Sequence, residues 1–209
     1  MTLKTITTAL ILASAISSGA TAGSFTVPAS ADPISHAADS TDWQGFYIGA
    51  HISATDAPVT VLLNGVFSNE VPSEATLYGG FAGYNVQRGN FVFGGEAAFN
   101  FGRLNAGTGW TENYIDLKAR AGFAAGNALI YGFAGYTMAD LVESTGASPD
   151  LASGLNFGAG VDYQLRNGLF VGVDYTLRNL SGDYDQNLFP GYSFEIPANS
   201  ISLRVGKQF

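Results

Sequence analysis

The feature that most constrains this chain is a two-residue alternation of apolar and polar side chains that recurs from Trp43 to the last residue. In the segment 155–165, one set of alternate positions carries Leu155, Phe157, Ala159, Val161, Tyr163 and Leu165. The positions between them carry Asn156, Gly158, Gly160, Asp162 and Gln164. Successive side chains of a β-strand point to opposite faces of a sheet, so this pattern predicts strands with one apolar and one polar face.

Eight segments carry this pattern, and we predict one strand for each: 44–53, 75–87, 91–101, 113–124, 128–137, 154–165, 169–180 and 200–209. The fifth segment is apolar on both faces, so its orientation stays open. Its two faces carry Leu129, Tyr131 and Phe133 against Ile130, Ala134 and Tyr136.

The connections between these segments alternate in length. Short links follow the second, fourth and sixth strands: Arg88-Gly89-Asn90, Ala125-Gly126-Asn127 and Arg166-Asn167-Gly168. Long links begin near Ala54, Gly102, Met138 and Ser181. Short turns at one end and long loops at the other are the plan of outer-membrane barrels, in which the long loops are extracellular. The chain is therefore predicted to be all-β, with a single eight-stranded antiparallel up-and-down transmembrane β-barrel over residues 43–209.

The first residues have the composition of a secretory signal peptide. Lys4 supplies a positive charge, residues 6–16 are apolar and uncharged, and Ala20-Thr21-Ala22 is a small-x-small cleavage site. We expect residues 1–22 to be removed. Residues 23–42 are rich in Ala, Ser, Pro and Asp, which predicts a flexible periplasmic lead-in.

The overall composition excludes several other classes of protein. The chain has no cysteine, which excludes a disulfide scaffold and thiolate–zinc sites. Beyond the signal peptide, no uncharged apolar run approaches the roughly 20 residues that a membrane-spanning helix needs. The sequence pI near 4.5 argues against a nucleic-acid partner, which requires a basic face.

The polar faces of the predicted strands carry four acids and four bases: Glu96, Asp116, Lys118, Arg120, Asp162, Asp174, Arg178 and Arg204. The same faces carry Gly49, Gly94, Gly122, Gly158, Gly160, Gly172 and Gly206. Small residues beside a few long charged ones suit the narrow interior of an eight-stranded barrel. Because a lone buried charge is costly, we expect a structural network of interior ion pairs. Its expected pairs are Glu96 with Lys118 or Arg120, and Asp174 with Arg204.

The alternative is a soluble lipocalin-like barrel whose charged face is wet. That barrel would have to pack six phenylalanines into one small core: Phe91, Phe93, Phe99, Phe101, Phe123 and Phe157. Lipid accommodates these rings more easily, so the apolar faces are expected to point outward.

The last segment alternates Ile201, Leu203, Val205 and Phe209 with Ser202, Arg204, Gly206 and Gln208. An apolar alternation that ends on Phe209 resembles the signal read by the outer-membrane barrel assembly machinery. Lys207 departs from this signal, because an apolar or aromatic residue is usual at its position. A lysine near the periplasmic rim can snorkel toward water.

Five short motifs resemble the porin-like outer-membrane immunogenic proteins, within the group that carries an OmpA-type barrel domain. They are Trp43-Gln44-Gly45-Phe46-Tyr47-Ile48-Gly49, Gly83-Tyr84-Asn85-Val86-Gln87, Val92-Phe93-Gly94-Gly95-Glu96, Arg120-Ala121-Gly122-Phe123 and Asp174-Tyr175. Family members more often have Glu at the place of Asp174. The resemblance extends from Trp43 to Phe209 and implies a surface-exposed membrane component rather than a reaction.

No catalytic, cofactor-binding or metal-binding constellation is evident in the sequence. His51 lies on the inward face of the first strand, where an interior hydrogen-bonding role is expected. A lipid A deacylase, which is also an eight-stranded barrel, needs a Ser–His–acid set that faces lipid.

The predicted loops are acidic, with Asp56, Glu70, Glu74, Glu112, Asp140, Glu143, Asp150, Asp183, Asp185 and Glu195 against Arg103. Loop solubility explains these acids, and divalent-cation binding shared with lipopolysaccharide phosphates is the alternative.

We therefore expect a non-enzymatic protein of the Gram-negative outer membrane with a structural or surface-interaction role, in membrane integrity, adhesion or immune exposure. Its expected partners are outer-membrane lipid, lipopolysaccharide, the barrel assembly machinery and an unidentified extracellular ligand, with no cofactor. A gated small-solute porin is the second hypothesis, and a lipid-modifying barrel enzyme is the third. An eight-stranded barrel has no open aqueous channel unless its interior rearranges.

Overall fold

The computed structural model describes residues 41–106, 109–143, 152–183 and 190–209. The predicted signal peptide and nearly all of the predicted lead-in lie outside these residues. No helix among the described residues is long and apolar enough to cross a membrane.

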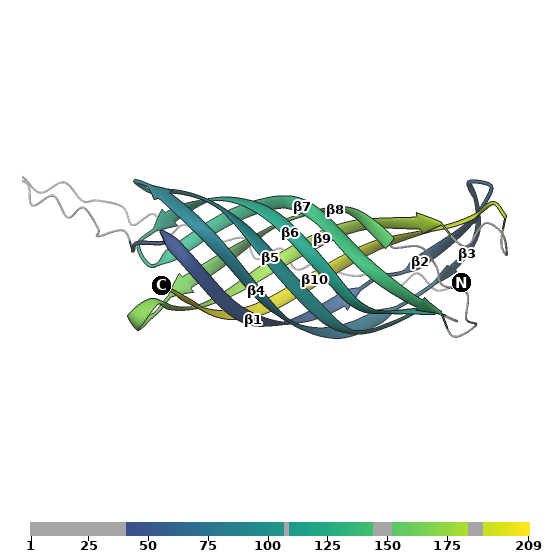
Figure 1. Cartoon of the computed structure of the whole chain (residues 1–209), viewed down its shortest axis with the longest axis horizontal. Coiled ribbons are helices and arrows are strands. Elements are labelled where there is room, and N and C mark those ends of the chain that lie inside the picture. The colour runs from purple at the N-terminus through teal and green to yellow at the C-terminus, as the bar shows by residue number, and fades with distance from the viewer. Residues whose placement is uncertain (1–40, 107–108, 144–151, 184–189) are drawn as a thin grey trace, which may run out of the picture. The chain divides into compact units, whose positions relative to one another are not determined.

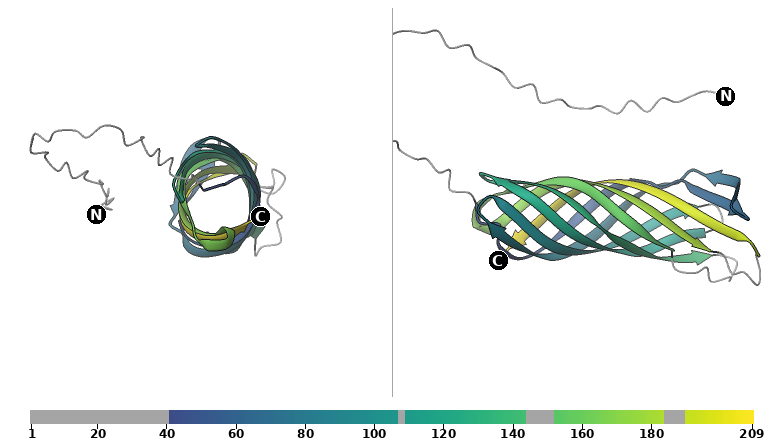
Figure 2. Two further views of the ribbon diagram at one scale, coloured as in Figure 1. Left: turned by 90° about the vertical axis from the view of Figure 1, so that its left-hand side faces the viewer. Right: turned by 90° about the horizontal axis from the view of Figure 1, so that it is seen from above.

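Eight antiparallel strands form a closed ring (Figures 1 and 2). They are β1 (Gly45–Asp56), β4 (Glu74–Arg88), β5 (Phe91–Ala106), β6 (Gly109–Ala125), β7 (Ala128–Glu143), β8 (Ala152–Gln164), β9 (Leu169–Asp183) and β10 (Tyr192–Gln208). Each strand pairs with the next along the chain, and β1 closes the ring on β10 with Gly49 opposite Gly206. The prediction of a single eight-stranded antiparallel barrel is confirmed.

The strands are longer than the alternation predicted, and one hairpin was missed. β5 continues to Ala106 and β7 to Glu143, while β10 begins at Tyr192 rather than at residue 200. The missed hairpin, β2 (Val59–Leu63) and β3 (Val66–Val71), lies in what was predicted to be the first long loop. Its turn has positive φ at Asn64 (51°) and Gly65 (75°), as a type I′ turn requires. An Asn-Gly pair between apolar runs is a strong hairpin signal, so this hairpin could have been predicted from the sequence.

Tight turns lie at the end of the barrel that also holds Phe209, the end marked C in Figure 1. Gly89 and Gly126 have φ of 60° and 58° and each occupies the first central position of a two-residue turn. The third turn is a short 3-10 segment, η1 (Arg166–Gly168). Outer-membrane barrels place such short turns in the periplasm, so we expect this end to be periplasmic and the opposite end extracellular, and we name the two ends accordingly.

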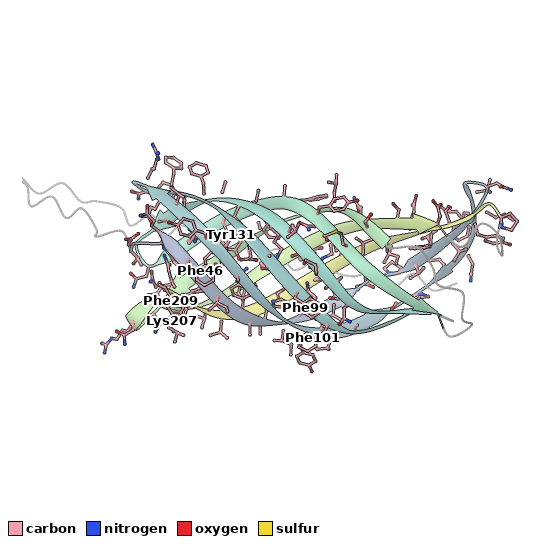
Figure 3. The ribbon with its side chains drawn as sticks, viewed as in Figure 1. Phe46, Phe99, Phe101, Tyr131, Lys207 and Phe209 are labelled. Atoms are coloured by element: carbon pink, nitrogen blue, oxygen red, sulfur yellow. The ribbon has the colours of Figure 1, made fainter. Side chains whose placement is uncertain are left out.

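The outer face of the barrel is apolar. Phe91 is 59% exposed, and the side chains of Phe99 and Phe101 project outward from β5 (Figure 3). The other phenylalanines assigned to this face from the sequence, Phe93, Phe123 and Phe157, are also exposed. On β7, the orientation left open by the sequence is settled by burial. Leu129, Tyr131 and Phe133 are buried inside, while Ile130 and Tyr136 are exposed.

Side chains fill the interior in layers. One apolar cluster lies toward the turns and includes Trp43, Tyr47, Phe81, Leu129, Tyr131, Phe133 and Phe170. A second lies toward the loops and includes Val59, Leu77, Tyr114, Leu180, Phe194 and Ile196. Buried polar and charged residues are interspersed with both clusters, since Asp162 lies opposite Leu129 and Asn100 lies opposite Tyr114. Inward-facing glycines make room for the large rings, since a Cβ at Gly158 would collide with the ring of Phe133 and the backbone oxygen of Tyr175.

Replacing Gly158 with Ala is expected to destabilise the barrel by about 1–3 kcal/mol, because the added methyl overpacks the interior. Gly132→Ala on the adjacent strand is the matched control, since its Cβ would face outward with the nearest atom 3.7 Å away. That control is expected to change stability by less than about 0.5 kcal/mol. Urea unfolding in phospholipid vesicles measures both, and equal effects would contradict the inward assignment of Gly158.

Candidate functional site

The charged residues predicted to share an interior face lie on five strands and are all buried. β5 supplies Glu96, β6 supplies Asp116, Lys118 and Arg120, β8 supplies Asp162, β9 supplies Asp174 and Arg178, and β10 supplies Arg204. Each is at most 8% exposed. The register explains their proximity, because Glu96 lies directly opposite Lys118 on the neighbouring strand.

Glu96 is the centre of a cluster of three acids and three bases. Its Oε2 accepts hydrogen bonds from Arg204 Nη2 at 2.6 Å and Arg120 Nη1 at 2.9 Å. Lys118 Nζ lies 3.6 Å from Oε1. Charge-assisted hydrogen bonds as short as the two that Oε2 accepts are about twice as strong as neutral ones. The structure thus brings Glu96 together with both of its proposed partners on β6.

Arg204 joins the remaining acids of this cluster. Its Nη1 donates to Asp174 Oδ2 at 3.0 Å, and its Nε lies 3.3 Å from Asp162 Oδ1. Asp162 also accepts from Arg120 Nη2 at 2.9 Å. One guanidinium therefore contacts three carboxylates, and the proposed pairing of Asp174 with Arg204 is present in the structure.

Aromatic rings that no sequence pattern assigned to the site pack against the cations. The Arg120 guanidinium lies 3.8 Å from the ring centre of Tyr131, and that of Arg204 lies 4.0 Å from the ring centre of Phe81. Tyr47 Oη donates to Glu96 at 3.0 Å and accepts from Arg120 at 2.6 Å. A cation–π contact stabilises a desolvated cation by about 2 kcal/mol. Because both faces of β7 are apolar in the sequence, the pattern could not assign Tyr131 to the interior.

A second, smaller ion pair lies nearer the extracellular end. Arg178 donates from Nε to Asp116 Oδ1 at 3.0 Å and from Nη2 to Oδ2 at 2.7 Å, which is a bidentate pair. Thr137 Oγ1 also donates to Asp116, at 2.6 Å. Arg178 Nη1 donates to Ser200 Oγ at 2.8 Å. Asp116 is thereby held directly by β7 and β9, and Arg178 connects it to Ser200 on β10.

His51 also lies on the inner face of the barrel. Its Nε2 is 2.8 Å from Asn100 Oδ1, and its ring stacks on Phe81 with a centroid distance of 6.2 Å. Asn100 in turn donates to Asp116 Oδ2 at 3.3 Å. His51 therefore belongs to the interior polar network and does not face lipid.

The acidic loop residues are only partly described. Asp56, Glu70, Glu74, Asp183 and Glu195 are exposed, whereas the side chains of Arg103, Glu112, Asp140, Glu143, Asp150 and Asp185 lie outside the description. Within the described part of the chain, no group of three or more His, Asp or Glu side chains could hold a metal ion. The divalent-cation hypothesis stays a prediction.

Replacing Glu96 with Gln is expected to destabilise the barrel by about 3–5 kcal/mol, because it leaves buried cations without their counter-charge. Glu195→Gln removes the same charge from an exposed position on β10 and is expected to cost less than about 0.5 kcal/mol. Urea unfolding of both variants in vesicles checks this. A loss below about 1 kcal/mol for the Glu96 variant would show that the central acid is dispensable.

Comparisons with known proteins agree with this architecture. A family model described as "Outer membrane protein beta-barrel domain" matches residues 9–209. A 22 kDa outer membrane protein of Rhizobium leguminosarum bv. viciae is 27% identical over 176 residues, which cover 80% of this chain and 78% of the relative.

Two solved structures are similar to this chain at low sequence identity. The outer membrane protein OprG of Pseudomonas aeruginosa is 13% identical with a TM-score of 0.53, and the match covers 79% of this chain and 96% of OprG. Neisserial surface protein A is 14% identical with a TM-score of 0.47, and the match covers 77% and 97% of the two chains. From its family match and its closed eight-stranded ring, the chain belongs to the outer membrane protein β-barrel domain family and is a bacterial outer-membrane protein.

Proposed function

We propose that this protein is a non-catalytic, closed barrel that stabilises the outer membrane and presents a surface for interaction outside the cell. The observation that carries the proposal is the filled interior. The cluster around Glu96 packs among the rings of Tyr47, Phe81 and Tyr131, and the pair of Asp116 with Arg178 packs against Tyr114. Side chains that neutralise one another across the lumen favour a mechanical role over transport.

The extracellular end supports the interaction part of the proposal. The β2–β3 hairpin lies at the end of the barrel opposite to Phe209 (Figure 1). β2 pairs with β10, with Leu63 opposite Tyr192, so the hairpin is anchored to the barrel wall. Val66 and Phe67, next to its turn, are 68% and 62% exposed. Exposed apolar side chains on a rigid support are suited to contact another macromolecule.

A gated small-solute pore is the second candidate, and the buried charges are the observation that favours it. A channel would require Arg120 or Arg204 to leave its carboxylates, which is costly in a low-dielectric interior.

A lipid-modifying enzyme is third, because a Ser–His–acid set would have to face lipid, and His51 is bound to Asn100 inside the barrel.

The assembly role of Phe209 remains part of this proposal. The Phe209 N–H donates to the Phe46 backbone oxygen at 2.9 Å, and the two rings lie 6.2 Å apart. Phe209 therefore lies at the seam where β10 meets β1 (Figure 3). A terminal aromatic at the closing seam is well placed for recognition during barrel assembly.

Complementation of a strain that lacks the protein distinguishes the three candidates. Wild-type protein is expected to restore detergent resistance of the envelope, without raising small-solute uptake and without changing the mass of lipid A. Increased uptake that Glu96→Gln alters would favour the pore instead. A change in lipid A mass would favour the enzyme. Failure to restore resistance would contradict the structural role.

A further inference from the structure

Exposed charges on this barrel are segregated between its two ends. Among the described residues, the exposed acids Asp56, Glu70, Glu74, Asp183 and Glu195 all lie toward the extracellular end. The exposed bases of the same part of the chain are Arg88, Arg166 and Lys207, and all three lie at the periplasmic rim. Asp42 is the exposed acid at that rim, and its carboxylate accepts the backbone N–H of Gln44. Among the described side chains of the periplasmic rim, bases therefore outnumber acids by three to one.

Two of these bases, Arg166 and Lys207, lie on neighbouring segments of the rim. Lys207 on β10 lies opposite Leu169, the first residue of β9. Arg166 begins the turn that immediately precedes Leu169. That turn is fixed in place, because Leu165 N–H donates to Leu169 O at 2.6 Å and Gly168 packs against the backbone of Gln208. Long side chains from these two positions can reach one ligand together.

An apolar surface borders the two cations on the membrane side. Lys207 occupies an outward position in line with Val205 and Phe209, so its stem runs along the lipid-facing surface. Its Nζ lies 5.6 Å from the centre of the Phe209 ring, which in turn contacts Phe46. Figure 3 shows Phe46, Lys207 and Phe209 together at this end of the barrel. Leu165 and Leu169 are exposed beside them.

We propose that Arg166 and Lys207 form a binding site for the phosphate headgroup of an anionic phospholipid in the periplasmic leaflet. The paired cations supply charge complementarity to the phosphate. Phe46, Phe209 and Leu169 form the surface along which the acyl chains lie. Basic side chains next to a bilayer attract anionic lipid, and their stems snorkel along apolar surface to reach it. This site explains a lysine at a position where the strand pattern predicts an apolar residue.

Native mass spectrometry of the folded full-length protein in neutral detergent tests the site. The probes are phosphatidylglycerol and phosphatidylcholine with identical acyl chains. Wild-type protein is expected to bind its first phosphatidylglycerol at least about fivefold more tightly than phosphatidylcholine. The double variant Arg166→Gln with Lys207→Gln is expected to reduce that preference to about twofold or less.

Three controls make the result specific. Arg88→Gln removes one cation from the same rim on β4, away from the pair, and is expected to keep the preference; an equal loss would indicate diffuse charge and overturn the site. Lys207→Arg is expected to retain the preference, and its loss there would contradict a charge-based site. Inorganic phosphate at matched concentration is expected not to displace the lipid, since displacement would mean that the apolar surface contributes nothing. A heat-dependent mobility shift in SDS electrophoresis verifies that each variant is folded.

Discussion

An eight-stranded ring encloses a space only wide enough for side chains, so each charge inside it must be paired with an opposite charge on another strand. In this barrel the four acids and four bases satisfy that condition in two groups. Glu96, Asp162 and Asp174 balance Lys118, Arg120 and Arg204, while Asp116 balances Arg178. Some of these ion pairs, such as Glu96 with Arg204 and Asp116 with Arg178, connect strands that share no backbone hydrogen bonds. The network therefore fixes the cross-section of the barrel.

The outer face of the same strands must also be compatible with lipid. The alternation of small and large residues allows a filled interior and an apolar outer face on the same strands. Inward glycines such as Gly158 and Gly160 leave room for the rings of Phe133 and Tyr131. Those rings in turn contact the side chains of Lys118, Arg120 and Arg204. Outside, large apolar side chains such as Phe93 and Phe99 contact lipid. The inward glycines, the aromatic rings and the buried cations are thus packed against one another inside the barrel. The large apolar side chains lie on the outer face.

Much of this arrangement could be predicted, because a period of two residues assigns a face to every side chain in a strand. The pairing of Glu96 with Lys118 and Arg120 followed from placing charges of opposite sign on consecutive strands. The orientation of β7 could not be derived, because Tyr131 and Ile130 are both apolar and only the three-dimensional packing distinguishes them. The role of Phe81 depends on a contact with Arg204 from a distant segment, which no local pattern encodes. The β2–β3 hairpin was encoded by Asn64-Gly65, but it lay where a long loop was expected.

A double-mutant cycle on Asp116 and Arg178 tests whether interior charges stabilise this barrel as balanced sets. This pair is bidentate and separate from the cluster around Glu96. The free energy of unfolding in vesicles is measured for Asp116→Asn, Arg178→Gln and the double variant. The double variant is expected to be more stable than the sum of the two single losses implies, by about 1–3 kcal/mol. Additivity within about 0.5 kcal/mol would contradict it.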